Sequence, residues 1–250
     1  MPKVKVNDIE MYYEVHGEGE PIVFLHGFTV SSQRWTSFIP DFKEHFQLIL
    51  PDMRGHGRST NPSDTFTHRQ SALDVYALLD HLQVEKFKAV GYSSGGMTLI
   101  HMATQQPERI TDLVLISATT HYPKEWREIA SKEMDKKMDD WYDKVSSLHQ
   151  HGAEQTKRLR LQMYYMKDNY DDMNFTPPYL STIKARTLIV HGDRDPFFPV
   201  HIPVTLYNSI PDAYLWIMPN MGHGGVAEPS PSEGLVKTIF DFLTGKWETG

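Results

Sequence analysis

The sequence predicts an α/β protein whose doubly wound, mostly parallel sheet has eight strands. Short runs of β-branched and apolar residues alternate with longer runs in which apolar residues recur at three- and four-residue steps. Strands that alternate with helices in this way build a parallel sheet covered by helices. Several short runs, such as Pro21–Leu25 and Phe46–Leu50, are almost entirely apolar, which is typical of strands buried on both faces.

The first two strands are expected to differ from the rest. Lys3–Val6 and Met11–Val15 flank a turn at Asn7 and Asp8, which predicts an antiparallel hairpin. The other strands are predicted at Pro21–Leu25, Phe46–Leu50, Phe87–Val90, Leu113–Ile116, Thr187–Val190 and Tyr214–Ile217.

Three helices are predicted to cover this sheet. Thr67 has the side chain of a helix N-cap, and the apolar residues after it predict a helix that extends to about Leu82. Met97–Ala103 is typical of a buried helix. The last helix contains Leu235–Leu243.

The alternation of strands and helices stops before the seventh strand. From Trp126 onward, apolar residues recur at helical spacing. This predicts one long amphipathic helix that begins near Pro123 and ends before Gly152. Two i,i+4 ion pairs, Glu128–Lys132 and Glu133–Lys137, are expected on its exposed side.

A second helix is predicted over Glu154–Lys167, and Pro177 and Pro178 end the irregular segment. We expect residues 121–180 to form a helical cap over the open end of the sheet. Residues 1–120 and 181–250 then form one core domain into which the cap is inserted.

Composition excludes several classes of function. The net charge is −7 and no basic stripe is present, which argues against nucleic acid as a partner. The absence of cysteine excludes disulfides and thiol nucleophiles, and it suits a cytoplasmic protein. No apolar run approaches the roughly 20 residues that span a bilayer, and no secretory signal is visible at the start.

A metal site is not expected. His149 and His151 stand close together, but no carboxylate lies at ligand spacing from them. We therefore interpret the segment with these two histidines as a solvated helix end. Neither a metal nor another cofactor is predicted. The expected partner is a small-molecule substrate.

The most informative motif is the turn between the predicted strand at Phe87–Val90 and the helix that follows it. Gly91–Gly95 reads Gly-Tyr-Ser-Ser-Gly. In a strand–turn–helix context this G-x-S-x-G pattern is typical of a nucleophile elbow. The glycines remove Cβ atoms where strand and helix nearly collide, so that Ser93 is held on a strained turn with its hydroxyl exposed. Ser93 is therefore the candidate nucleophile.

A serine nucleophile needs a base and an acid that orients the base. His223 follows the last strand and has glycines on both sides, and neutral histidine suits proton transfer near pH 7. Asp193 and Asp195 compete as the acid. Asp195 is preferred because it lies deeper in the turn and is followed by proline and aromatic residues that could shield it. Asp193 is expected to pair with Arg194 or to hold the turn.

The oxyanion of acyl transfer needs two N–H donors. The backbone N–H of Ser94 stands at the start of the elbow helix, where amide groups point at the reacting carbonyl. The second donor is expected from the loop His26–Phe28, which reads His-Gly-Phe after a buried strand. Phe28 is the predicted donor, and its ring is expected to wall the pocket.

Together these segments resemble the α/β-hydrolase superfamily over nearly the whole chain. The resemblance rests on His26–Phe28, Asp52–Ser59, Gly91–Gly95, Gly192–Asp195 and Gly222–His223. It implies an α/β-hydrolase fold, the catalytic residues Ser93, Asp195 and His223, and the oxyanion donors Phe28 and Ser94. It also implies that Asp52, Arg54 and Ser59 hold a loop and take no part in catalysis.

Departures from family patterns narrow the expected function. There is no His-Gly-Gly-Gly stretch of the hormone-sensitive-lipase group and no His-Gly-Gly-Pro-Gly of proline iminopeptidases. Epoxide hydrolases and haloalkane dehalogenases of this fold carry Asp where Ser93 stands. Phe28 stands where many haloperoxidase-like relatives carry Trp.

These observations predict a carboxylesterase-like serine hydrolase that acts on small to medium, apolar esters. The substrate is expected to contact aromatic residues of the loops and the cap, namely Phe28, Trp126, Trp141 and Phe197, although cap aromatics also serve to pack helices together. A lactonase, a thioesterase or a carbon–carbon bond hydrolase with the same triad is an alternative, as is a ligand receptor of low turnover.

Overall fold

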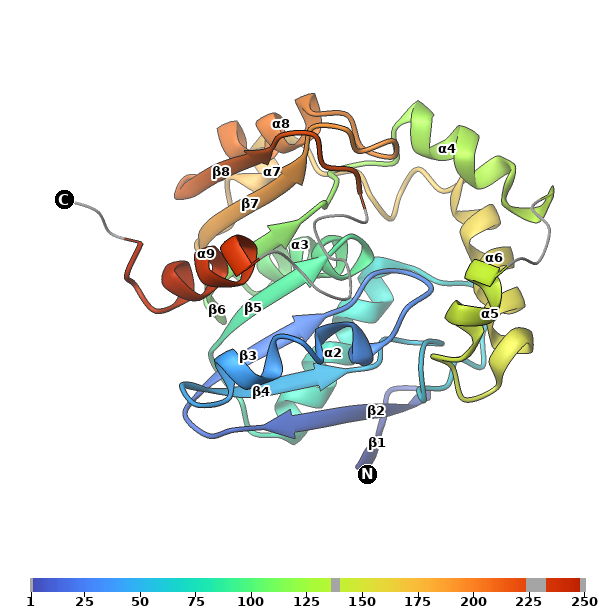
Figure 1. Ribbon diagram of the computed structural model, residues 1–250, viewed down its shortest axis with the longest axis horizontal. Helices are drawn as coiled ribbons and strands as arrows, with labels where there is room; N and C mark the ends of the chain where they lie inside the picture. Colours follow the sequence, from blue (N-terminus) through green and yellow to red (C-terminus); the bar gives the residue numbers. More distant parts are fainter. Residues whose placement is uncertain (1, 136–139, 224–232, 248–250) are drawn as a thin grey trace.

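A computed structural model describes residues 2–135, 140–223 and 233–247. Its strands form one sheet in the order β1-β2-β4-β3-β5-β6-β7-β8 (Figure 1). The strands are β1 (Lys3–Val6), β2 (Ile9–His16), β3 (Glu20–Leu25), β4 (Phe46–Pro51), β5 (Phe87–Tyr92), β6 (Ile110–Ile116), β7 (Arg186–Gly192) and β8 (Ala213–Met218).

The sheet is mixed but mostly parallel. β1 pairs with β2, and β2 with β4, in antiparallel fashion, whereas every pair from β4 to β8 is parallel. The predicted fold class and the predicted N-terminal hairpin are thus confirmed. Asn7 takes up the positive φ of 48° that the hairpin turn requires, a conformation that asparagine tolerates better than most residues.

Helices cover both faces of the sheet, so the central strands bury alternate side chains in two separate cores. In β3, Val23 and Leu25 face one core with α2 (His68–His81), α3 (Ser94–Gln105) and α8 (His201–Ser209). Ile22 and Phe24 face the other core with α1 (Ile39–Phe42) and α9 (Glu233–Leu243). This two-sided burial is the reason that the strand is apolar throughout. Figure 1 shows α1 and α9 in front of the sheet and α2 and α3 behind it.

The three helices predicted for the core correspond to α2, α3 and α9, whereas η1 (Ser32–Trp35), α1 and α8 were not predicted. Thr67 caps α2, because its side chain accepts a hydrogen bond from the backbone N–H of Gln70 at 3.1 Å. The helices and 3-10 turns outside the segment between β6 and β7 are η1 (Ser32–Trp35), α1 (Ile39–Phe42), α2 (His68–His81), α3 (Ser94–Gln105), α8 (His201–Ser209) and α9 (Glu233–Leu243).

The segment between β6 and β7 is helical, but the single long helix predicted there is wrong. The chain forms α4 (Lys124–Ser131), η2 (Glu133–Asp135), α5 (Asp140–Ser146), α6 (Gly152–Met166) and α7 (Pro177–Leu180). The second predicted helix, by contrast, is α6. Figure 1 shows α4, α5 and α6 along one end of the sheet.

The break after α4 has a physical reason in Glu133. This side chain was expected in solvent, paired with Lys137, but it is buried, and Lys137 lies outside the described residues. Its carboxylate accepts a hydrogen bond from Tyr142 at 3.0 Å and lies 3.4 Å from Nε of Arg160. A buried carboxylate must be paired. Ending α4 here allows α5 and α6 to supply both partners.

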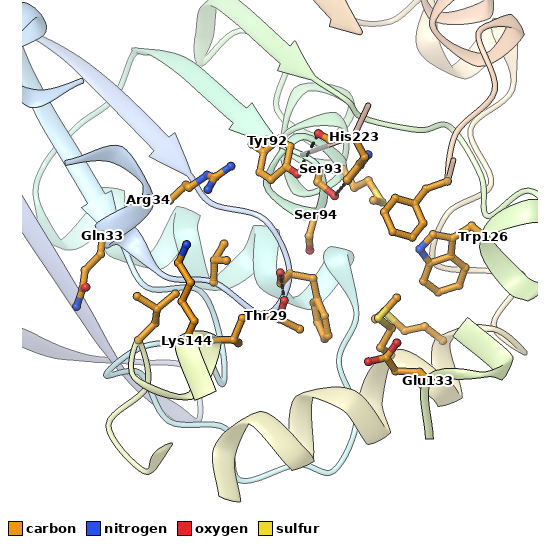
Figure 2. Close-up of a pocket in the computed structure, with 18 of the residues that line it drawn as sticks. Thr29, Gln33, Arg34, Tyr92, Ser93, Ser94, Trp126, Glu133, Lys144 and His223 are labelled. Atoms are coloured by element: carbon orange, nitrogen blue, oxygen red, sulfur yellow. Dashed lines mark hydrogen bonds between the residues drawn. The ribbon is translucent and has the colours of Figure 1, made fainter. Parts of the chain in front are cut away.

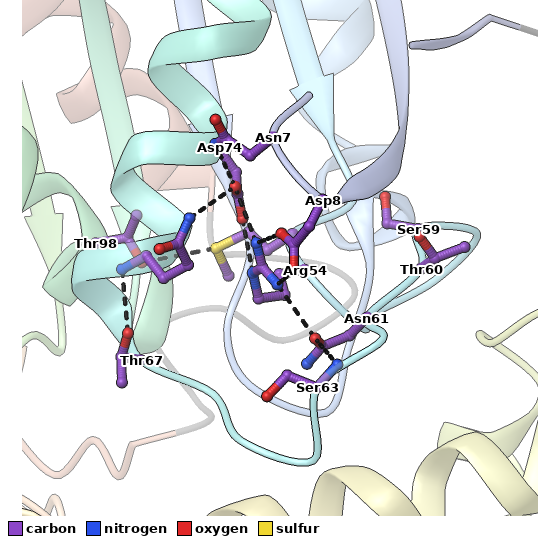
Figure 3. Close-up of polar contacts among 12 residues, drawn as sticks. Asn7, Asp8, Arg54, Ser59, Thr60, Asn61, Ser63, Thr67, Asp74 and Thr98 are labelled. Atoms are coloured by element: carbon purple, nitrogen blue, oxygen red, sulfur yellow. Dashed lines mark hydrogen bonds and ion pairs between the residues drawn. The ribbon is translucent and has the colours of Figure 1, made fainter. Parts of the chain in front are cut away.

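The loop after β4 is held by polar contacts, as the resemblance implied for Asp52, Arg54 and Ser59. Asp52 accepts the backbone N–H groups of Ser32 and Arg58, both at 2.8 Å. Ser59 Oγ donates to the carbonyl of Asp52 at 2.6 Å. Figure 3 shows Arg54 between α2 and the β1–β2 hairpin, where its guanidinium contacts two aspartates.

Within the part of the chain that the structure describes, no helix is both long and apolar enough to cross a membrane.

Candidate active site

The turn between β5 and α3 holds Ser93 in a strained conformation. Ser93 has φ 51° and ψ −115°, a region that side chains other than glycine rarely adopt. The glycines on either side are sterically required. A Cβ on Gly91 would lie 2.6 Å from the backbone nitrogen of Gly96, and one on Gly95 would lie 2.1 Å from the carbonyl oxygen of Leu25. The turn therefore has the backbone of a nucleophile elbow.

Ser93, His223 and Asp195 form one chain of hydrogen bonds. Ser93 Oγ lies 2.9 Å from Nε2 of His223, and Nδ1 of His223 lies 2.7 Å from Oδ2 of Asp195. Because a carboxylate only accepts, Nδ1 carries the proton and Nε2 is left to accept from the serine hydroxyl. The rings of Phe197 and Phe198 lie edge-on to the imidazole, at 4.7 and 5.3 Å between centroids. The three side chains come from segments far apart in the sequence.

The two candidate acids have different partners in the structure. The side chain of Asp195 is fully buried, and its Oδ1 accepts the backbone N–H groups of Phe197 and Phe198 at 2.8 and 3.1 Å. This leaves Oδ2 to face the imidazole. Asp193 instead accepts the N–H of Met221 at 3.2 Å and lies 3.7 Å from the guanidinium of Arg194. Asp193 thus holds the turn.

The two expected oxyanion donors lie beside the elbow. Ser94 is the first residue of α3, and the first N–H groups of a helix have no acceptor within the helix. Phe28 follows Gly27, whose Cβ, if present, would lie 3.6 Å from Cβ of Ser93. Among the described residues, neither N–H donates a hydrogen bond to another protein group.

Ser93 and His223 open into a cavity of about 1300 Å³. Much of its wall is apolar or aromatic, with contributions from Phe28, Tyr122, Trp126, Met163, Met166 and Phe197. Phe28, Trp126 and Phe197 were predicted substrate contacts. The side chain of Trp141, the fourth prediction, lies outside the described part of the structure. Figure 2 shows Gln33, Arg34 and Lys144 on one side of Ser93 and Trp126 and Glu133 on the other.

Several residues of the cavity had no signal in the sequence. Arg34 and Lys144 are charged residues of ordinary-looking surface segments, yet both line the cavity. His68 and Tyr122 are buried and also line it. Neither stands next to a motif, and their contacts come from segments far away in the chain.

His149 differs from its prediction as a solvated helix end. Its side chain is buried and links two loops: Nδ1 accepts the N–H of Gly57 at 2.9 Å, and Nε2 donates to the carbonyl of Thr29 at 3.0 Å. Burial lowers the pKa of His149 to about 4, so the imidazole is neutral at pH 7. Among the residues in view, no group of His, Asp and Glu side chains has the arrangement of a metal site.

Residues 20–151 of the sequence, more than half of the chain, match the family described as alpha/beta hydrolase fold. The chain belongs to this family. Serine hydrolase BPHL of Mus musculus is 27% identical over 250 residues, covering 88% of this chain and 79% of that relative. Soluble epoxide hydrolase of Corynebacterium sp. (strain C12) is 34% identical over 111 residues, but the match spans only 39% of that relative.

Solved structures share the fold along the whole chain. The 2-hydroxy-6-oxo-6-phenylhexa-2,4-dienoate hydrolase from Rhodococcus sp. strain RHA1 superposes with a TM-score of 0.82 at 20% identity, and the superposition covers 97% of each chain. Relatives of this chain include esterases, epoxide hydrolases and carbon–carbon bond hydrolases. The α/β-hydrolase described here is a serine hydrolase.

Proposed function

We propose that this α/β-hydrolase cleaves carboxylic esters through an acyl-enzyme on Ser93, with His223 as the base and Asp195 as the acid that orients it. The observation that carries the proposal is the hydrogen-bond chain from Ser93 to Asp195, which starts on a strained turn and opens into a largely apolar cavity. A hydroxyl, a base and an orienting carboxylate in this geometry are what acyl transfer by serine requires.

In the first step, Nε2 of His223 takes the proton of Ser93 while Oγ attacks the ester carbonyl. The N–H groups of Phe28 and Ser94 hold the oxyanion, and Asp195 stabilises the imidazolium by accepting from Nδ1. The imidazolium then gives its proton to the departing alkoxide, and the alcohol leaves.

In the second step, water enters the position of the alcohol. His223 takes a proton from the water, which attacks the acyl carbonyl, and the proton passes to Oγ of Ser93 as the acid is released. Each proton transfer uses the one imidazole, so no other acid or base is needed.

The cavity supports substrates with small to medium apolar groups. Phe28, Trp126 and Phe197 supply apolar surface near the nucleophile, and thioethers such as Met163 adapt to different shapes. Trp141 is proposed as a further contact.

We assign residues 121–180 as the cap and residues 1–120 and 181–250 as the core domain, with the substrate bound between them. A chain without cysteine suits the cytoplasm.

The decisive experiment measures hydrolysis of p-nitrophenyl esters of increasing acyl length, with two lactones and a thioester for comparison. Ester hydrolysis together with labelling of Ser93 by a fluorophosphonate, located by mass spectrometry, is the expected result. Turnover of lactones or thioesters at a higher kcat/KM than any ester would replace the proposed substrate class. An unlabelled Ser93 with no turnover would point to a ligand receptor.

A further inference from the structure

A second chain of hydrogen bonds with the same types of residue lies directly beside the first. Ser94 Oγ lies 2.9 Å from Nε2 of His68, and Nδ1 of His68 lies 2.9 Å from Oδ2 of Asp172. All three side chains are buried. His68 begins α2 and Asp172 follows α6, and the two residues are 104 positions apart in the chain. The proposed reaction does not use this chain.

The partners of Asp172 define where the protons lie. Burial would raise the pKa of this carboxyl, but hydrogen bonds from the side chain and backbone of His68 and from the backbone of Arg69 lower it to about 2. Asp172 is therefore ionised and accepts from Nδ1 of His68. With the imidazole proton on Nδ1, Nε2 of His68 accepts the hydroxyl proton of Ser94. This leaves the lone pairs of Ser94 Oγ as acceptors.

This serine faces the substrate cavity. Both Ser94 and His68 line the cavity, and apolar groups surround the pair. The ring of Phe66 lies 5.2 Å from that of His68, and Tyr122, which contacts His68 through its hydroxyl at 3.1 Å, stacks on Trp126. In Figure 2, Ser93 points toward His223, while the hydroxyl of Ser94 points away from it. A polar atom in a largely apolar wall favours substrates that can form a hydrogen bond with it.

Ser94 is not placed to be a second nucleophile. It is the first residue of a regular helix, whereas Ser93 has the strained backbone that presents a nucleophile. We infer that Ser94, backed by His68 and Asp172, binds a hydroxyl group that the substrate carries on its acyl side, close to the scissile carbonyl. The inference rests on the proposed function. It adds a specificity-determining side chain to a residue whose backbone is assigned to the oxyanion.

A substrate hydroxyl fits better than a substrate carbonyl. A hydroxyl donates to Ser94 Oγ and leaves the bond from Ser94 to His68 intact. A carbonyl oxygen would need the proton of Ser94, and the buried Nε2 of His68 would then lose its donor, which is costly. The closeness to the carbonyl follows from the position of the residue, since the N–H of Ser94 is proposed to contact the carbonyl oxygen itself.

The test compares p-nitrophenyl butyrate with the p-nitrophenyl esters of 2-hydroxybutyrate and of both 3-hydroxybutyrate enantiomers. The quantity measured is the ratio of kcat/KM for each hydroxy ester to kcat/KM for the butyrate. In Ser94→Ala this ratio should fall about tenfold for at least one hydroxy ester, as expected for one neutral hydrogen bond. The fall is modest because Ser94 keeps His68 as a partner when the substrate has no hydroxyl. Comparing variant with wild type cancels the intrinsic reactivity of each ester.

Two further variants make the result specific. Thr98→Ala removes a hydroxyl one turn along α3, where it donates to the backbone carbonyl of Ser94 at 2.9 Å and does not line the cavity. Its ratio should equal that of the wild type. His68→Gln removes the imidazole that holds Ser94 in place, so its ratio should fall in the same direction as in Ser94→Ala. His68→Gln also tests the inference if the Ser94→Ala variant does not fold.

A ratio that is the same in the wild type and in these Ser94 and His68 variants, for every hydroxy ester, overturns the inference. If the butyrate is hydrolysed in that case, the proposed function stands alone. If no ester is hydrolysed and fluorophosphonate does not label Ser93, the proposed function fails and the inference fails with it.

Discussion

Ser93 combines backbone strain with a complete set of hydrogen-bonding partners. A φ of 51° at a non-glycine residue raises the free energy of the folded backbone. The conformation persists because Gly91, Gly95 and the end of β3 are packed tightly around it. The strain fixes the direction of Oγ toward His223 before any substrate arrives. Preorganisation of this kind reduces the entropy that must be lost on the way to the transition state.

Ser93→Ala should lower kcat for a p-nitrophenyl ester by about 10⁴–10⁶-fold, because the covalent route is removed. The urea midpoint of unfolding should change little, because serine and alanine both carry a Cβ and therefore bear the same backbone strain at this turn. Steady-state kinetics and urea denaturation on the same preparations check both statements. A Ser93→Ala enzyme with full activity would show that the nucleophile lies elsewhere.

Asp195→Asn should lower kcat by about 10⁴-fold, because an amide that donates to His223 stabilises the wrong tautomer. Asp193→Asn is the matched control. It changes an aspartate two residues away that contacts Met221 and Arg194 rather than His223, and its activity should stay within about tenfold of the wild type. The reverse order of activities would assign the acid to Asp193.

Secondary structure elements are joined here by a few buried ion pairs as well as by apolar packing. Arg54, in the loop after β4, contacts Asp74 of α2 at 2.8 Å and Asp8 of the β1–β2 hairpin at 2.6 Å (Figure 3). The Asp74 side chain is fully buried, whereas that of Asp8 is 55% exposed. The two ion pairs share one guanidinium but differ in solvent access.

Asp74→Ala should lower the free energy of unfolding by about 3–5 kcal/mol, because it leaves a buried guanidinium without its main partner. Asp8→Ala removes the exposed partner of the same guanidinium and should cost less than about 1 kcal/mol. Urea denaturation of both variants provides the comparison. Equal losses would mean that burial does not govern the strength of these pairs.

At the scale of the whole molecule, buried neutral histidines make the stability of the fold depend on pH. Burial lowers the pKa of both His101 and His149 to about 4. His149 joins the segment before α6 to loops of the core, at Gly57 and Thr29. His101, on α3, faces Asp172 at 3.5 Å. Burial makes protonation of either imidazole in the folded protein unfavourable, and the carboxylate of Asp172 offsets this only in part for His101.

The free energy of unfolding should fall as the pH drops from about 6.5 to about 4. An unfolded histidine has a pKa near 6.5, so in this window the unfolded chain binds more protons than the folded chain and acid favours unfolding. The loss should be on the order of a few kcal/mol for the two histidines together. Urea denaturation at several pH values measures it. His149→Gln should flatten the dependence, and an unchanged slope would contradict the role assigned to His149.

Local patterns explain why much of the fold could be predicted from the sequence. The strands, α2 with its Thr67 cap, and the turn at Gly91–Gly95 each depend on residues that are neighbours in the chain. The expectation for the Asp52–Ser59 loop came from family resemblance, and its hydrogen bonds bear it out. The preference for Asp195 over Asp193 depended on the shielding residues that follow it, and Oδ2 of Asp195 lies 2.7 Å from Nδ1 of His223.

The failures have a common cause, which is partners that are distant in the chain. Helical periodicity continued through Glu133, but the helix ends before it because Arg160, 27 residues later, holds that carboxylate in the interior. His149 had the sequence context of a surface residue and became a link between loops. No local pattern could relate His68 to Asp172 or to Ser94.

The sequence by itself determined the strands, the helices α2, α3, α6 and α9, the elbow and the residue types available for acyl transfer, because apolar periodicity and glycine sterics act between neighbours in the chain. Only the tertiary structure decided which buried charges and imidazoles meet, and therefore where the cap helices end and what lines the cavity. Burial makes an unpaired polar group costly, so partners are chosen by proximity in space, which sequence separation does not reveal.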